Sequence, residues 1–233
     1  MKITFIVNQY ARISGGNRAL FEYANRLQTA GHKVRWIVLA KSYKAYRLDK
    51  KFISLLKGVV TLPPETIDWM ENSIPLEVLP YNHSKHIPSA DFLVATAWQT
   101  AEFTAALPAE TGRKFYFIQH YESLWAKEGN REMAERTYQA PLKKIVISNW
   151  LKELLFKDHQ QESTVLVTPV NKGEFYCHDK KWNAQKRICM LHHDYDWKGY
   201  KDGIEALKKT RENCPNITLV VFGEKMEDPT PLF

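Results

Sequence analysis

The sequence KITFIVNQYARISGGNRALFEYANRL, residues 2–27, decides the fold of this chain. Residues 2–7 are an apolar run typical of a buried strand, and the turn Ser14-Gly15-Gly16 leads into a segment with apolar residues at helical spacing. Gly31 stands where a helix cap is expected, and a second apolar run follows at residues 34–39. Strand, glycine turn, helix and strand in this order predict a parallel βαβ unit.

The same unit recurs near the other end of the sequence. An apolar run at residues 188–191 is followed by a loop through Lys198-Gly199, a helical segment that ends near Arg211 and a second run at residues 217–222. A single βαβ unit cannot cover both faces of its strands. The repeat therefore predicts a second sheet domain that this sequence only begins, and we expect the chain to be a fragment.

Strands and helices alternate between the two ends. Further strands are predicted at residues 76–79, 91–95, 114–118, 144–147 and 164–167. This alternation predicts an α/β fold with a doubly wound, Rossmann-like parallel sheet, in which ligands bind beyond the carboxyl ends of the strands. The expected organisation is a first domain at 1–170, a polar linker at 171–186 and an incomplete second domain at 187–233.

Composition and charge narrow the class of protein. The net charge of +7 suggests anionic partners, without deciding between nucleotides, lipid headgroups and nucleic acid. Cys177, Cys189 and Cys214 show no CxxC spacing, which argues against a disulfide framework and against a structural zinc site. No apolar run reaches the roughly 18 residues of a membrane span, and the N-terminal run is too short for a signal peptide. We expect a cytoplasmic protein.

Two common nucleotide-binding motifs are missing. A dinucleotide-binding domain needs GxGxxG after the first strand and an acidic residue at the end of the second. This chain has GGNRAL at residues 15–20, and its second predicted strand ends at Ala40-Lys41. The P-loop signature is also missing. A nucleotide, if one binds, is therefore held in some other way.

Five segments together resemble a known family. They are GGNRALFEYANRLQTAGHKV at 15–34, ADFLVATAW at 90–98, FYFIQHYE at 115–122, IVISNWL at 145–151 and WKGYKDGIEAL at 197–207. In this order they resemble the GT-B-fold glycosyltransferases, specifically glycosyltransferase family 4. The resemblance covers the whole chain and rests on the register of all five segments.

The resemblance implies a hexosyltransferase of bacterial polysaccharide or cell-envelope biosynthesis. It would move a sugar from a nucleotide-sugar donor to a glycan or lipid-linked acceptor, with retention of configuration and without a metal or cofactor. The first domain would hold the acceptor and the second the nucleotide.

The resemblance also implies roles for single residues. His120 and Lys198 would be catalytic, and Gly15, Gly16, Lys198 and His192 would bind the donor diphosphate. Glycine at 15 and 16 allows positive φ and lets the backbone approach a ligand. Polar residues at the predicted strand ends are the candidates for acceptor binding: Asn8, Gln9, Arg18, Gln119, Glu122, Ser148 and Asn149.

Two departures from the family pattern bear on activity. His192 stands where many members carry arginine, and the family's pair of glutamates seven residues apart belongs beyond residue 233. We therefore expect this fragment to be inactive alone. The alternative is a catalytically inactive module that binds a glycan or a nucleotide sugar.

A basic amphipathic helix is predicted at residues 41–57. Cations flank its apolar stripe at Lys41, Lys44, Arg47, Lys50, Lys51 and Lys57. Such a helix suits peripheral contact with an anionic membrane, although a solvated face of an ordinary packed helix has the same pattern. No recognition helix or aromatic-interleaved basic strand is present, so we expect no nucleic-acid partner.

Overall fold

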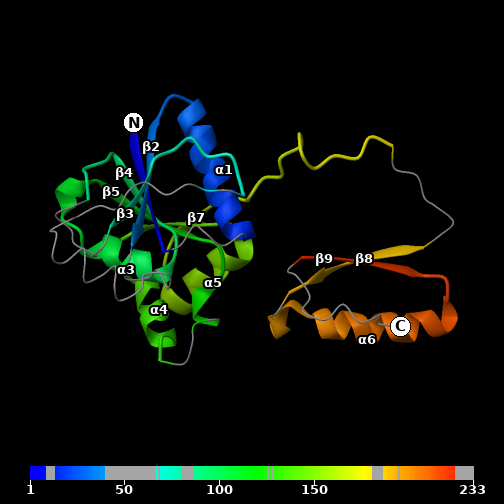
Figure 1. Ribbon diagram of the computed structural model, residues 1–233. Helices are drawn as coiled ribbons and strands as arrows, with labels where there is room; N and C mark the ends of the chain where they lie inside the picture. The colour runs from blue at the N-terminus through cyan, green and yellow to red at the C-terminus, as the bar shows by residue number, and fades with distance from the viewer. Residues whose placement is uncertain are drawn as a thin grey trace, which may run out of the picture. The chain divides into compact units, whose positions relative to one another are not determined.

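The structure is a computed structural model that describes residues 1–8, 14–39, 67, 69–79, 87–124, 126, 129–179, 186–193 and 195–223. Two compact units make up the chain, Met1–Pro169 and Val170–Phe233 (Figure 1). The predicted helix at 41–57 and the candidate Gln9 lie outside the described residues. No helix in the described ranges is long and apolar enough to cross a membrane.

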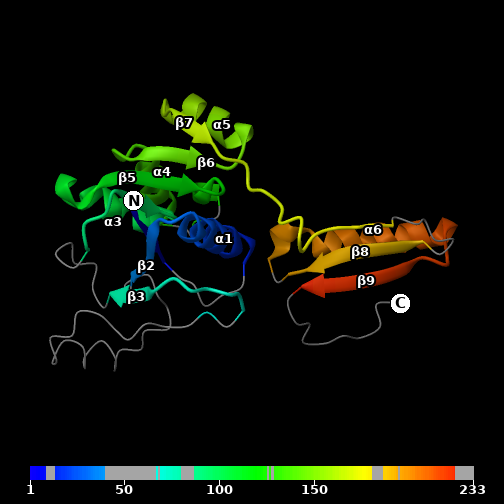
Figure 2. The same ribbon diagram turned by 90° about the horizontal axis from the view of Figure 1, so that it is seen from above.

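A seven-stranded sheet forms the centre of the first unit. Its strands are β1 Lys2–Val7, β2 Lys33–Leu39, β3 Leu76–Leu79, β4 Phe92–Ala95, β5 Arg113–Ile118, β6 Lys143–Val146 and β7 Ser163–Val165. They lie in the order β3-β2-β1-β4-β5-β6-β7, and every neighbouring pair is parallel (Figure 2). The chain thus builds one half outward from β1 and returns to build the other. This order confirms the doubly wound sheet predicted from the sequence.

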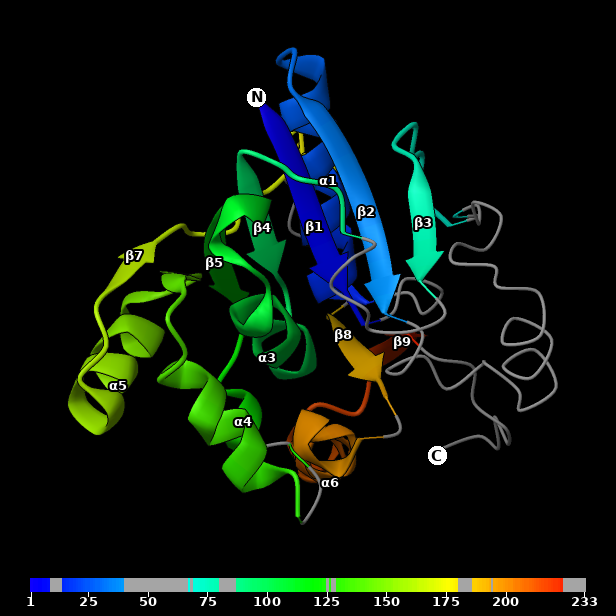
Figure 3. The same cartoon turned by 90° about the vertical axis from the view of Figure 1, so that its left-hand side faces the viewer.

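Helices cover both faces of this sheet. They are α1 Gly15–Thr29, α3 Trp98–Ala106, α4 Arg131–Tyr138 and α5 Asn149–His159, with short 3-10 turns at Ala109–Thr111 and Glu122–Leu124. Figure 3 shows α1 behind β1 and β2 and the helices α3 and α4 in front of the sheet. Because side chains alternate along a strand, Phe5 of β1 packs in the cluster with α1 while Ile6 packs in a cluster on the opposite face.

Trp36 is the largest side chain in the core beneath α1. It has no exposed surface, and its ring lies 4.7 Å from Phe5 and 4.5 Å from Phe21 of α1, measured between ring centroids. Contact between one ring on each element fixes the position of α1 on the sheet. The first turn of α1 is therefore held at the carboxyl end of β1.

A single parallel βαβ unit makes up the described core of the second unit. It consists of β8 Arg187–His192, a 3-10 turn at Asp196–Lys198, α6 Tyr200–Asn213 and β9 Thr218–Gly223. Ile204 and Leu207 of α6 are buried. Leu191, Val220 and Phe222 are exposed, the last to 57%. Parallel sheets normally have both faces covered, so this unit leaves apolar strand surface in contact with water.

Candidate functional site

The first turn of α1 opens the candidate site at the carboxyl end of β1. Ser14 caps the helix, because its Oγ accepts a hydrogen bond of 3.1 Å from the amide of Asn17. Within the described part of the chain, the amides of Gly15 and Gly16 have no acceptor, as is usual for the first residues of a helix. The expectation of a positive φ at Gly15 and Gly16 is wrong. Both lie in the helix itself, and positive φ occurs at Gly31, beyond its other end.

Gly16 is needed for close approach rather than for a special backbone angle. A Cβ built on Gly16 would lie 3.3 Å from both Nε2 and Oε1 of Gln119, whereas one built on Gly15 would meet nothing within 4 Å. Gln119 directly follows β5, so the structure brings the first turn of α1 against the end of a strand two positions along the sheet. Two residues predicted for the site, Gly16 and Gln119, therefore lie together.

A second contact joins the end of β1 to α3. The side-chain amide of Asn8 donates to Oε1 of Gln99 over 3.5 Å, at the limit of a hydrogen bond. Thr96 strengthens the same junction, since its hydroxyl donates to the carbonyl of Ile6 over 3.0 Å. Gln99 was not singled out from the sequence. Its position four residues past a predicted strand end was the available signal.

Glu122 was predicted to contact the acceptor, and the structure turns its carboxylate into the interior. The residue is 8% exposed. Its Oε2 accepts hydrogen bonds from the amide of Trp98 over 2.5 Å and from the hydroxyl of Tyr116 over 2.9 Å. Its own amide donates to the hydroxyl oxygen of Tyr138 over 2.7 Å. Glu122 therefore ties β5, α3 and α4 together instead of facing an acceptor.

Burial changes the acidity of this cluster. Loss of solvent raises the pKa of Glu122 to about 7, although the hydrogen bonds from Tyr116 and Trp98 favour the ionised form and oppose the shift. Burial also raises the pKa of Tyr116, and the neighbouring carboxylate adds to that effect. The Glu122 carboxyl thus keeps its proton to a higher pH than an ordinary glutamate does.

A stack of aromatic rings supports the segment after β5. Tyr121 and Tyr138 stack with centroids 5.2 Å apart, and Tyr116 lies 6.4 Å from Tyr138 in a nearly parallel plane. The hydroxyl of Tyr121 lies 2.8 Å from Nε2 of His159, at the end of α5. Residues 119–122 are therefore held between β5, α4 and α5.

The remaining predicted residues of the first unit lie around this edge. His120 is exposed next to Gln119, and Arg18 is half-buried in the first turns of α1. Ser148 caps α5 through a 3.2 Å hydrogen bond from the amide of Leu151, and Asn149 is exposed beside it. Within the described ranges no hydrogen bond joins Ser148 or Asn149 to Gln119.

Lys198 and His192 belong to the second unit. The Lys198 ammonium lies 4.2 Å from the ring centroid of Trp197, a cation–π arrangement at the surface. Gly199 follows with a φ of 71° and begins α6, so here a positive φ does require glycine. His192 ends β8, and its ring lies 4.8 Å from that of Tyr200. Both predicted residues thus adjoin the first turn of α6.

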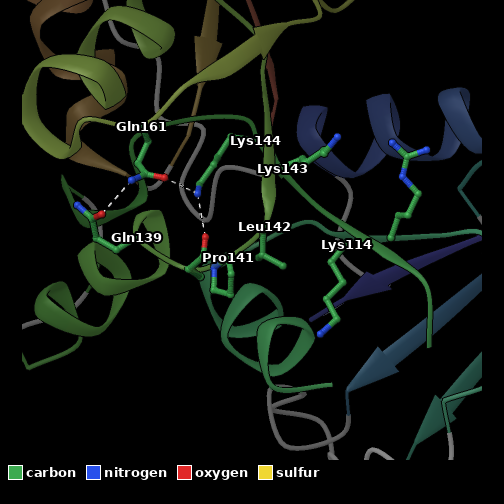
Figure 4. Close-up of a pocket in the computed structure, with 9 residues that line it drawn as sticks. Lys114, Gln139, Pro141, Leu142, Lys143, Lys144 and Gln161 are labelled. Atoms are coloured by element: carbon green, nitrogen blue, oxygen red, sulfur yellow. Dashed lines mark hydrogen bonds between the residues drawn. The ribbon is translucent and has the colours of Figure 1, made fainter. Parts of the chain in front are cut away.

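The described residues contain no metal-binding cluster, and a pocket lies at the other edge of the sheet. No group of three or more His, Cys, Asp and Glu side chains that could hold a metal ion occurs among the described residues. A pocket of about 440 Å³ lies at the amino ends of β5 and β6, the opposite edge of the sheet from Gln119 (Figure 4). Its lining includes the cations Arg113, Lys114, Lys143 and Lys144.

Two lysines of this pocket, Lys114 and Lys144, form hydrogen bonds within the fold. Lys114 donates to the carbonyls of Ala105 and Leu107 at the end of α3, while Lys144 donates to the carbonyl of Ala140 over 2.8 Å and to Oε1 of Gln161 over 2.6 Å (Figure 4). Cations are favoured at helix C-termini, where carbonyls lack helical partners. These charges are therefore used within the fold.

Comparison with known proteins shows the fold. No family model matches the sequence, and no curated protein sequence does. The chain is similar in structure to the catalytic domain of starch synthase IV from Arabidopsis thaliana, bound to ADP and acarbose, with a TM-score of 0.61 and 9% identity over 95% of this chain and 68% of that one.

Two further solved structures are similar to this chain. TarM has a TM-score of 0.61 and 8% identity over 97% of this chain and 72% of its own. An alpha-glucosyltransferase in complex with UDP and a 13-mer DNA containing a HMU base has a TM-score of 0.56 and 11% identity over 97% of this chain and 57% of its own. These neighbours have the GT-B fold, and the α/β architecture predicted from the sequence is thereby confirmed.

Alanine substitutions at Gly15 and Gly16 separate the effect of helix propensity from the effect of crowding by the Gln119 side chain. We expect Gly15→Ala to raise the free energy of unfolding by roughly 0.5–1 kcal/mol, because alanine loses less entropy in a helix. Gly16→Ala should gain less, since its Cβ must displace the Gln119 amide. Urea unfolding measures the energies, and NMR signals of the Gln119 side-chain amide report the displacement. Equal signals in both variants would contradict the contact.

Lys144→Met and Lys143→Met form a matched pair in the pocket. We expect Lys144→Met to lower the free energy of unfolding by about 1–3 kcal/mol, because the Ala140 carbonyl and the Gln161 amide lose a buried donor. Lys143 is exposed, so its replacement should change stability by no more than about 0.5 kcal/mol. Urea unfolding compares them, and equal effects would show that Lys144 has no capping role.

Glu122 should make stability depend on pH. Its pKa is about 7 in the folded state against an ordinary 4.5, so the folded chain binds a proton that the unfolded chain has lost. The free energy of unfolding should therefore fall as pH rises from about 4.5 to 7, by on the order of 3 kcal/mol, and then level. Glu122→Gln should remove this fall, while the exposed Glu102→Gln should keep it. Parallel curves for wild type and Glu122→Gln in pH-dependent urea unfolding would refute the assignment.

Proposed function

We propose that this chain is part of a glycosyltransferase that moves a sugar from a nucleotide-sugar donor to a glycan or lipid-linked acceptor. The observation that carries the proposal is the approach of Gly16 to Gln119, which places the first turn of α1 and the end of β5 at one edge of a GT-B-type sheet. Ligands of doubly wound sheets bind at this edge. The resemblance of the five sequence segments to family 4 supports a retaining enzyme of that family.

The helix start at Gly15 and Gly16 suits a diphosphate. Their amides point from the positive end of α1, and no Cβ blocks an approaching ligand at either position. We assign them to the donor diphosphate. Backbone amides of this kind stabilise negative charge as it develops on a leaving group.

The acceptor side is assigned to the polar residues around the same edge. His120 is exposed there and would contact the transferred sugar or the acceptor. Asn8, Gln9, Arg18, Gln119, Ser148 and Asn149 would bind the acceptor by hydrogen bonds, with Gln9 lying outside the described residues. Glu122 would act from beneath this surface.

The donor side is assigned to the second unit. The Lys198 ammonium would stabilise charge on the leaving diphosphate. His192 would add a donor when protonated or as a neutral imidazole. We accordingly propose a metal-independent hexosyltransferase without a bound cofactor.

Pathway and location are further parts of the proposal. The family resemblance favours bacterial polysaccharide or cell-envelope biosynthesis, where acceptors are often lipid-linked. Residues 41–57, which lie outside the described part of the chain, would provide peripheral contact with an anionic membrane.

The exposed apolar surface of the second unit favours a second candidate function. Leu191, Val220 and Phe222 would be covered in a complete donor domain, so these 233 residues alone are proposed to be inactive. A chain with this surface could instead be a glycan- or nucleotide-sugar-binding module without chemistry. Binding without turnover distinguishes this function from the first.

Turnover tests the proposal directly. The chain, and a longer version that completes the second sheet, are mixed with UDP-, ADP-, GDP- and dTDP-hexoses and glycan acceptors, and nucleoside diphosphate release is measured. We expect release from the longer version, and a loss of about 100-fold in kcat for His120→Ala, because an interaction with the reacting sugar is removed. His178→Ala, an exposed histidine outside the site, is the control.

The possible results separate the candidates. Comparable rates from both versions would contradict the inactivity of the 233-residue chain. Saturable binding of a nucleotide sugar with no turnover in either version would favour the binding module. Neither binding nor turnover with any donor would refute both.

A further inference from the structure

Three elements meet at the buried carboxyl of Glu122. The amide of Trp98 is the first of α3, the hydroxyl of Tyr116 comes from β5, and Tyr138 of α4 accepts from the Glu122 amide. Glu122 is 8% exposed, so a bound glycan could not reach this carboxylate without moving the elements around it. Its contacts are internal on every side that the structure describes.

The first turn of α3 lacks a cap of its own. Ala97 occupies the N-cap and has no side-chain oxygen. Thr100 accepts from the amides of Thr96 and Ala97 over 2.9 and 3.0 Å, which leaves the amide of Trp98 to Glu122. A carboxylate from the next strand loop therefore completes this helix start, where negative charge is favoured.

Both contacts at the edge of the sheet adjoin this cap. Gln99, which accepts from Asn8, directly follows Trp98. Gln119, which crowds Gly16, lies three residues before Glu122, with the exposed His120 between them. The Glu122 carboxyl thus joins the first turn of α3, which carries Gln99, to the segment after β5, which carries Gln119 and His120.

We propose that Glu122 is a positioning residue, whose carboxyl clamps α3 to the segment after β5 and so sets the places of Gln99, Gln119 and His120. This inference rests on the proposed function for its effect on transfer, but the clamp itself can be observed without any activity. The hydrogen-bond partners of Glu122 are groups of the protein itself.

Ionisation should change the strength of the clamp. Burial brings the pKa of Glu122 to about 7. The titratable groups that face it are Tyr116 of β5 and Tyr138 of α4, while His159 of α5 reaches the cluster through Tyr121. The charges of Asp158, Glu135 and Arg131 in turn shift the pKa of Tyr121. Hydrogen bonds to an ionised carboxylate are stronger than those to its neutral form, so the clamp tightens as pH rises through this range.

The first test follows the clamp by NMR in the chain without substrates. Amide signals of Trp98 and Gln99, on the α3 side of the clamp, are recorded from pH 5 to 9. We expect a shared titration with a midpoint near 7 in the wild type and its loss in Glu122→Gln. His159→Gln is the control, because it removes the histidine that reaches the cluster through Tyr121 and should leave the midpoint in place. A titration that survives in Glu122→Gln, or disappears in His159→Gln, overturns the proposal.

A second variant keeps the test decisive if Glu122→Gln fails to fold. Tyr116→Phe removes a hydrogen bond that favours the ionised carboxyl, so the midpoint should move to higher pH. An unchanged midpoint in Tyr116→Phe overturns the proposal equally.

The kinetic test uses whichever version of the protein shows transfer. We expect kcat to rise with pH through a midpoint near 7 and to lose this limb in Glu122→Gln, with kcat lowered roughly tenfold and the KM of the acceptor little changed. A raised KM with unchanged kcat would instead make Glu122 an acceptor contact and overturn the positioning role. A retained NMR titration with no transfer by any version would support the clamp and count against the proposed function alone.

Discussion

Every strand of the first unit runs in the same direction, and this one constraint sorts the charges of the fold. In a parallel sheet the helix N-termini gather at the carboxyl edge and the helix C-termini gather at the amino edge. Each edge therefore has its own sign of partial charge. The carboxyl edge holds Glu122 against the start of α3, and the amino edge holds Lys114 and Lys144 against the ends of α3 and α4.

This sorting separates charges that serve the fold from charges that can serve a ligand. Lys114 and Lys144 already donate to helix carbonyls, so the basic pocket in Figure 4 is largely accounted for by capping. At the other edge, Glu122 accepts a hydrogen bond from the start of α3, while the amides of Gly15 and Gly16 at the start of α1 have no acceptor among the described residues. An anion therefore has more to gain at α1 than at α3 or in the basic pocket.

The sequence predicted the sheet well because parallel strands are buried on both faces and read as apolar runs. The run at 2–7 and the strand Lys2–Val7 coincide, and so do the run at 76–79 and Leu76–Leu79. The final strand of the first unit was predicted too long, because Leu166 and Val167 are apolar yet exposed beyond Val165. Apolar composition does not distinguish a buried edge strand from an exposed segment that leaves the sheet.

Single site residues were harder to predict because their partners are distant and often belong to the backbone. Nothing local to Glu122 shows that its acceptor oxygen faces the amide of Trp98, 24 positions earlier. Gly15 and Gly16 look alike in the sequence, but only Gly16 meets Gln119, since that contact depends on the spacing of β1, β4 and β5.

Glu122 shows how a site position can oppose stability. Its raised pKa means that ionisation costs the folded state free energy, while the same ionisation strengthens its bonds to Trp98 and Tyr116. A glutamine of the same shape would avoid the cost and could still accept both bonds as a neutral group. The buried environment thus disfavours the ionised form of the Glu122 carboxyl. That same form holds α3 and the segment after β5 most firmly. A residue kept only for folding has no need of that charge, and a residue that fixes the edge of the sheet does.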